Sequence, residues 1–180
     1  MKPLRLLVLL VTLPLFLGGC GEKEMTQREL EVRDGLMYIK DSETLYTGEQ
    51  FLFYENGQKE QKVNYKDGKF NGFAISWHEN GEKKEEGNYK DDKLNGLWVS
   101  WYKNGQKEQE GHFKDGNPDG FFISWHENGK KKMEGSWKNG KEDGLHTQWH
   151  ESGKKSMESQ YKDGVESDVK AWRVTGEEIE

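Results

Sequence analysis

Glycines recur at a fixed interval of 24 residues along most of this chain, and that spacing constrains the fold more than any other feature. One series comprises Gly57, Gly81, Gly105, Gly129 and Gly153. A second series keeps the same interval and comprises Gly72, Gly96, Gly120 and Gly144. A fixed period of this order is the signature of repeat arrays, in which each unit packs on its neighbours. We therefore predict a repeat protein.

Each 24-residue unit has the pattern of a β-hairpin. In the stretch FAISWH, residues 73–78, apolar residues fall at every second position, which is the period of a strand. Asn80-Gly81 follows and favours a type I′ turn, with a return strand over about 83–90. The polar stretch KDGKFNG, residues 66–72, reverses the chain again. The sequence thus predicts an all-β fold, an elongated single-layer antiparallel sheet of tandem hairpins.

Aromatic residues recur with the glycines and define a candidate binding face. We expect alternation to place Trp77 on the same face as Gly87 and Tyr89. The opposite face, toward water, would carry Ser76, Ser100 and Ser124. A glycine two residues before each return-strand ring would leave a slot for an indole. The residues expected on the binding face are Trp77, Trp101, Trp125, Trp149, Tyr89, Phe113 and Trp137. Two interpretations stay open: the rings pack on one another, or they line a groove for a ligand.

The hexapeptide SWHENG occurs twice, at 76–81 and 124–129, and raises the question of a catalytic His-Glu pair. Adjacent strand residues point to opposite faces, so His78 and Glu79 cannot act as a hydrogen-bonded dyad. Histidines of neighbouring units would lie about 9–10 Å apart, too far to share one zinc ion. We expect turn-edge histidines, no metal, no cofactor and no enzymatic activity; a metal site and catalysis stay open as alternatives.

Charged residues are abundant and of both signs. Lysine and glutamate runs lie on the expected strands, which indicates a solvated face with cross-strand ion pairs. The formal net charge is −6, and nucleic acid requires a basic face. Nucleic acid is therefore excluded as the main partner.

Residues 1–19 have the features of a signal peptide. A basic head is followed by a short apolar run, and the stretch ends in LGGC, residues 17–20. This motif resembles the lipobox of bacterial lipoproteins, in which Cys20 would be acylated and become the mature N-terminus. Cys20 is the single cysteine of the chain, so an internal disulfide is excluded. An ordinary signal peptide or a buried thiol stays open as the alternative.

This organisation predicts three segments. Residues 1–19 are the signal peptide, 20–33 are the acylated cysteine with a flexible tether, and 34–180 are the repeat array, with about five full repeats and degenerate ends. The expected location is the bacterial cell envelope, with the protein on the membrane through its lipid anchor. Gly21-Glu22 lacks the aspartate of an inner-membrane retention signal, which favours the outer membrane where the cell has one.

The repeat units resemble a known family. The stretches YENGQK, residues 54–59, and YKDGKFNG, residues 65–72, are similar to MORN repeats of the variant form common in bacteria. The resemblance covers about 34–180; Asp92 and Asp168 stand where glycines are expected, and the last unit is one residue short. The resemblance implies an elongated sheet that contacts proteins or lipids without catalysis. Some bacterial members carry an antitoxin label.

These observations together predict a non-catalytic, envelope-anchored lipoprotein whose repeats bind or scaffold a protein partner. Two other functions stay open. One is an antitoxin or immunity-type protein that neutralises a partner toxin. The other is a module that binds cell-wall glycan or choline, because aromatic rings stack on sugars and cations.

Overall fold

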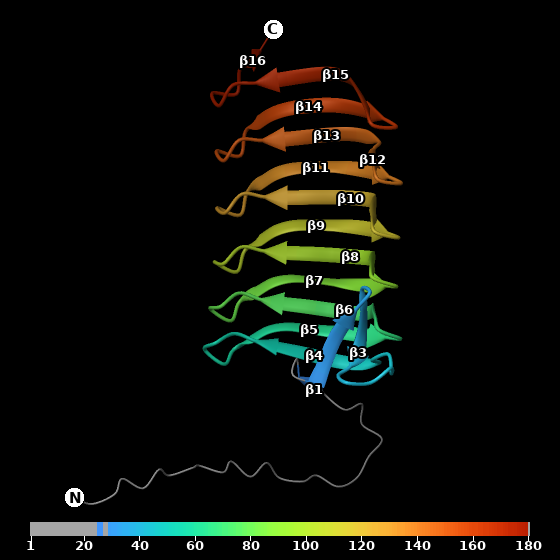
Figure 1. Ribbon diagram of the computed structural model, residues 1–180. Helices are drawn as coiled ribbons and strands as arrows, with labels where there is room; N and C mark the ends of the chain where they lie inside the picture. Colours follow the sequence, from blue (N-terminus) through green and yellow to red (C-terminus); the bar gives the residue numbers. More distant parts are fainter. Residues whose placement is uncertain (1–24, 27–28, 180) are drawn as a thin grey trace, which may run out of the picture.

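A single long antiparallel sheet dominates the computed structural model, which describes residues 25–26 and 29–179 (Figure 1). In the described part, fourteen strands form this sheet in the order β1-β4-β5 and onward to β16, with β12 beside β11. A two-stranded sheet, β2-β3, lies next to it, and no described segment is an α-helix. The predicted all-β hairpin array is confirmed.

The strands have the following bounds: β1 Met25–Thr26, β2 Leu30–Arg33, β3 Leu36–Ile39, β4 Gly48–Phe53, β5 Lys59–Lys66, β6 Lys69–Trp77, β7 Lys83–Lys90, β8 Lys93–Trp101, β9 Lys107–Lys114, β10 Asn117–Trp125, β11 Lys131–Lys138, β12 Lys141–Glu142, β13 Gly144–Trp149, β14 Lys155–Lys162, β15 Val165–Trp172 and β16 Glu178–Ile179. Apart from the parallel pair β1-β4, strands that lie side by side pair antiparallel.

One edge of the sheet carries the Asn-Gly turns, and their geometry differs from the type I′ turn expected. The Gly81 N–H donates to the His78 carbonyl, and the His78 N–H donates to the Glu82 carbonyl, each at 2.8 Å. Gly81 has a positive φ of 87°, whereas Asn80 does not have a positive φ. This is a three-residue loop, a type I turn closed by a left-handed glycine. The same bonds recur at Gly57, Gly105, Gly129, Gly153 and Gly176.

The type I′ turns lie at the opposite edge, in two-residue loops. Asp67 and Gly68 have φ values of 50° and 77°, and Lys66 pairs with Lys69 around them. Positive φ at both central residues is the requirement of this turn type. In the next unit Asp92 takes the glycine position with φ 66°, and its side chain accepts the Phe70 N–H at 2.8 Å.

The second glycine series lies at bulges within the strands. Between the pairs Gly87–Trp98 and Tyr89–Leu94 the register shifts, and Gly96 in the extra segment has φ 114°. In the last unit the shift falls between Glu158 and Gln160, and Asp168 adopts φ 49° there. The last hairpin forms in spite of its missing residue, because its bulge holds two residues, 168–169, where the earlier bulge holds three, 95–97.

The pairing register corrects the expected assignment of residues to faces. Ala74 pairs with Gly87 and Gly72 pairs with Tyr89, so even-numbered residues of β6 share a face with odd-numbered residues of β7. Trp77 therefore lies on the face opposite to Gly87 and Tyr89. The prediction that these residues share one face is wrong, and so is the prediction that the serines face water: Ser100 and Ser124 are buried, on the same face as Tyr89 and its equivalents.

Rings contact one another along the face that carries Tyr89, which we call the ring-packing face. The ring centroids lie 4.4–5.9 Å apart in three groups: Tyr65–Phe70 and Phe70–Tyr89; Trp98–Phe113; and Phe122–Trp137, Trp137–His146 and His146–Tyr161. A Cβ atom on Gly87 would lie 3.1 Å from the Trp98 ring. Glycine slots therefore exist, but they receive Trp98 and its equivalents instead of Trp77.

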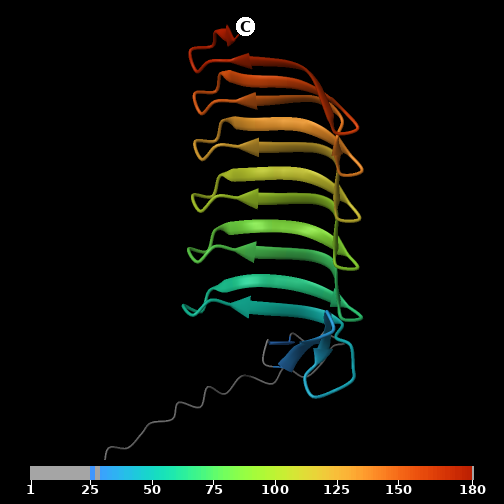
Figure 2. The same ribbon diagram turned by 45° about the horizontal axis from the view of Figure 1, so that its top comes forward.

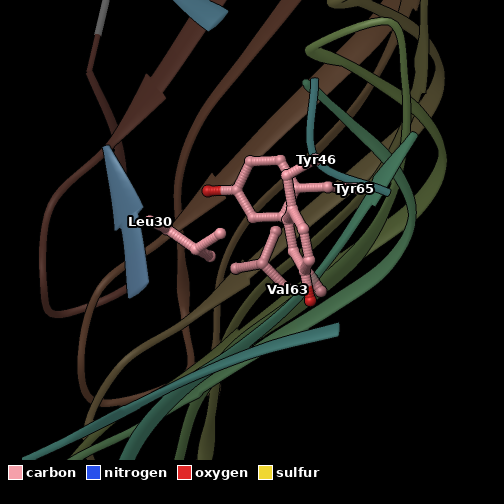
Figure 3. Close-up of a cluster of buried hydrophobic side chains, with 5 residues drawn as sticks. Leu30, Tyr46, Val63 and Tyr65 are labelled. Carbon is pink, nitrogen blue, oxygen red and sulfur yellow. The ribbon is translucent and has the colours of Figure 1, made fainter. Parts of the chain in front are cut away.

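A small core closes the N-terminal end of the ring-packing face. Leu30 of β2 packs there with Tyr46, Val63, Tyr65 and Ala74 (Figure 3). The β2-β3 hairpin lies against this end of the array (Figure 2). Residues 30–33 thus belong to the folded part, which moves the expected boundary at residue 33 toward the N-terminus. Residues 1–24, with the predicted signal peptide and Cys20, lie outside the described residues.

Candidate interaction surface

The recurring histidines connect one hairpin to the next. The His78 Nε2 lies 2.9 Å from the Trp101 carbonyl, one unit further along the chain. A carbonyl only accepts hydrogen bonds, so the imidazole must carry its proton on Nε2 and donate it. The same bond recurs from Tyr54 to Trp77, Tyr102 to Trp125, His126 to Trp149 and His150 to Trp172. Both tyrosine and histidine are suitable at this position, because each presents a hydrogen-bond donor at the required distance from its backbone.

The asparagines of the same loops form a second ladder. The Asn80 side chain accepts the Glu82 N–H at 3.1 Å, which fixes its own loop, and donates to the Lys103 carbonyl at 2.8 Å in the next loop. Asn56, Asn104 and Asn128 repeat both bonds. The histidine and the asparagine of SWHENG therefore form hydrogen bonds to the next hairpin. Among the described residues, no three histidine, cysteine, aspartate or glutamate side chains are placed together so that they could hold one metal ion.

The face opposite to the ring-packing face carries lysines over tryptophans, and we call it the Lys–Trp face. The Lys83 Nζ lies 5.1 Å from the centroid of the Trp101 ring and 2.8 Å from a carboxylate oxygen of Glu86. The same arrangement recurs for Lys107 with Trp125 and Glu110, Lys131 with Trp149 and Glu134, and Lys155 with Trp172 and Glu158. These ion pairs are formed within one strand; Lys62–Glu49 joins two strands, as expected for cross-strand pairs.

Exposed apolar side chains form a column on the Lys–Trp face. Phe73, Leu97, Phe121 and Leu145 occupy equivalent positions, four residues before each tryptophan. Their exposed fractions are 40%, 42%, 67% and 54%. The column recurs on every second strand, because the return strands place polar residues such as Asn88 and His112 opposite its members. Large apolar side chains that gather on an exposed face mark an interaction surface more often than a structural one.

The expected binding residues therefore divide between the two faces. Trp77, Trp101, Trp125 and Trp149 lie on the Lys–Trp face, whereas Tyr89, Phe113 and Trp137 lie on the ring-packing face. The interpretation that rings pack on one another applies to the ring-packing face, and the interpretation that rings are open to a ligand concerns the Lys–Trp face. Rings on the ring-packing face pack on rings, whereas Trp101, Trp125 and Trp149 contact lysines.

Sequence reasoning missed Trp98, Phe122 and His146, which fill the ring-packing face. Their spacing of 24 residues was the available signal. His146 is 5% exposed and lies between Trp137 and Tyr161, with its Nε2 2.9 Å from the Ser136 carbonyl. Because His146 contacts two packed rings and a backbone carbonyl, we assign it a structural role in the array.

The ring-packing face carries a groove of about 170 Å³ lined by Gln61, Ser76, Glu85 and Trp98, among others. Burial raises the pKa of the Tyr54 hydroxyl, which lines the same groove and donates to the Trp77 carbonyl. The Ser76 hydroxyl beside this groove is buried and forms no hydrogen bond to any described residue, so no base is placed to activate it as a nucleophile.

The fold and its ladders define a tandem β-hairpin repeat protein, in which each unit contacts its two neighbours. The model of a family described as MORN repeat variant matches residues 46–67, 72–91, 94–115, 118–139 and 142–163. These segments make up more than half of the chain, and the chain therefore belongs to this family. Repeats of this family are commonly modules that bind proteins or membranes, consistent with a non-catalytic role.

A comparison with curated proteins finds no match. No described segment forms a helix long and apolar enough to cross a membrane.

Proposed function

We propose that this protein is a non-catalytic lipoprotein of the bacterial cell envelope that binds a protein partner through its Lys–Trp face. The observation that carries the proposal is the column of Phe73, Leu97, Phe121 and Leu145, exposed beside tryptophans that make no ring contacts with one another. The family supports binding without catalysis. The predicted lipobox supports the anchor at Cys20.

Partner capture tests the binding face. Residues 21–180, which contain every described strand, would be immobilised and exposed to an envelope extract. A Phe121→Thr/Leu145→Thr variant removes two exposed apolar side chains from the column and keeps β-branched residues suited to strands. Val174→Thr is the matched control, because Val174 is 60% exposed but lies in the last loop. We expect the double variant to lose the partner and the control to retain it.

Two results would contradict the binding role. Equal capture by the double variant and the wild type would show that the column is not the contact surface. Retention of cell-wall glycan in place of a protein would favour a wall-binding module. A Trp101→Ala/Trp125→Ala variant extends the test to the indoles, with its melting temperature measured in parallel, because truncating large half-buried rings costs stability as well as contacts.

Labelling tests the anchor independently. Cells that express the full chain would be grown with a labelled fatty acid, and we expect the label on the protein and the protein in the membrane fraction. A Cys20→Ser variant should lose both. Labelling of the serine variant would rule out Cys20 as the acylated residue.

A further inference from the structure

We infer that the Lys–Trp face binds a proline-rich segment in the polyproline II conformation, laid along the array across the strands, with one turn of the segment on each hairpin. This inference rests on the proposed function and names the chemistry of the partner. Three features recur on this face once per hairpin, namely an indole, an exposed phenylalanine or leucine, and a neutral Lys–Glu pair.

The spacing of these features selects the partner's conformation. Equivalent residues of successive hairpins are separated by two strands, or about 9.4–9.8 Å. A polyproline II helix has three residues per turn and rises about 3.1 Å per residue, so every third side chain recurs at about 9.3 Å. The mismatch stays at or below about 0.5 Å per hairpin. A partner in this conformation can therefore follow several hairpins without losing register.

Other regular conformations fit this spacing less well. In an extended strand, side chains on one face recur at about 6.6–6.8 Å, so alternate contacts would fall between hairpins. In an α-helix, side chains seven residues apart recur at about 10.5 Å, and the misfit would accumulate to about 3–4 Å over four hairpins. Polyproline II is thus the regular conformation that keeps one contact on each unit.

The hydrogen-bonding groups of the face are complementary to such a segment. Within the described residues, the indole N–H groups of Trp77, Trp101, Trp125 and Trp149 donate to no protein acceptor, and none of these N–H groups is buried from solvent. The backbone carbonyls of polyproline II form no internal hydrogen bonds. Each hairpin therefore offers a free donor to a ligand that carries free acceptors on every turn. An indole also offers a flat apolar surface on which a proline ring can pack.

The charges of the face favour an uncharged ligand. Each lysine over a tryptophan is neutralised by a glutamate of its own strand, as in Lys83–Glu86 and Lys131–Glu134. A strongly acidic or basic segment would meet a like charge at every hairpin. The Lys83 side chain is 50% exposed, so it can swing from the ring when a ligand arrives.

Peptide binding to the full chain tests the inference. The probes are oligoprolines of about six, nine and fifteen residues, which correspond to two, three and five turns. Tryptophan fluorescence and titration calorimetry report binding. Because the described part carries five equivalent indoles, from Trp77 to Trp172, we expect affinity to rise at least tenfold from the shortest probe to the longest. A glycine-serine peptide of the longest length should not bind.

Matched variants locate the site. Phe121→Thr/Leu145→Thr should weaken binding of the longest oligoproline at least tenfold, and Phe113→Leu, on the ring-packing face, should leave it unchanged. Affinity that is independent of probe length, equal binding of the glycine-serine peptide, or no effect of the double variant would each overturn the inference. Preferential binding of cell-wall oligosaccharides would also overturn it.

Failure of this inference and failure of the proposed function give different results. If an envelope protein is captured through the Lys–Trp face but oligoprolines do not bind, the proline-rich partner is wrong and the binding role stands. If Phe121→Thr/Leu145→Thr has no effect on capture, the proposed binding face itself is wrong.

Discussion

Gly111 of β9 lies directly opposite Phe122 of β10, and the ring of Phe122 occupies the space that a Cβ atom on Gly111 would need. The same relationship joins Gly135 to His146 in the next unit. In the first hairpins the sizes are reversed, because Val63 lies opposite Ala74. One large and one small residue thus share these positions between hairpins, and together they fill the space above the sheet.

This complementarity predicts the outcome of exchanging the two sizes. Gly111→Val should lower the free energy of unfolding by about 1–3 kcal/mol, because the new side chain meets the Phe122 ring. Adding Phe122→Ala should recover much of that loss, because the pair then resembles Val63 and Ala74. Denaturant unfolding of the two single variants and the double variant gives the coupling energy. Additive effects would show that the residues do not compete for the same space.

The loop-edge ladder predicts which substitutions of histidine are tolerated. His126→Phe removes the donor to the Trp149 carbonyl and should cost about 1–2 kcal/mol. His126→Tyr should retain most of the stability, because Tyr102 makes the equivalent bond in the preceding unit. His112→Phe is the control, since His112 is exposed and outside the ladder. Equal melting temperatures for His126→Phe and His126→Tyr would refute a role for this hydrogen bond.

The left-handed aspartates predict two different responses to glycine. Asp168 adopts φ 49°, and Asp168→Gly should stabilise the last hairpin by up to about 1 kcal/mol, because glycine adopts positive φ without a steric penalty. Asp92→Gly relieves similar strain but loses the hydrogen bond to the Phe70 N–H, so its net effect should be near zero or destabilising. Hydrogen exchange of the amides in β15 and β8 separates the two effects, and the opposite ranking would contradict this account.

The buried Tyr65 predicts a loss of stability in alkali. Burial, followed by the nearby Asp92 carboxylate and Tyr46, raises the pKa of Tyr65 to about 12. An unfolded tyrosine has a pKa of about 10, so the contribution is complete below pH 10 and is lost as the pH rises toward 12. We expect unfolding free energy to fall by up to about 2 kcal/mol over that range. A Tyr65→Phe variant should show a shallower decline, and an identical slope would exclude Tyr65 as its source.

The sequence predicts the repeat and its hairpins because period and turn glycines are local signals. The face assignment is wrong at Tyr89 because the register shifts by one residue between Trp77–Lys83 and Ser76–Glu85, so that even positions of β6 pair with odd positions of β7 beyond this bulge. The I′ turn was assigned to Asn80-Gly81 instead of Asp67-Gly68, because both dipeptides favour it and loop length decides. The ladder from His78 to the Trp101 carbonyl joins groups 23 residues apart, a relation that appears only once the units are stacked.

The strands lie across the long axis of the array, and the two ends of the described chain lie at its opposite ends (Figure 1). Backbone hydrogen bonds between strands therefore run along that axis. A pull between the two ends would peel the terminal strand away one bond at a time, and would not shear a whole strand at once. Each hairpin of 24 residues would then release about 80 Å of extended chain. Under tension the array would therefore lengthen by one hairpin at a time. Optical tweezers should record unfolding at low force in steps of about 80 Å.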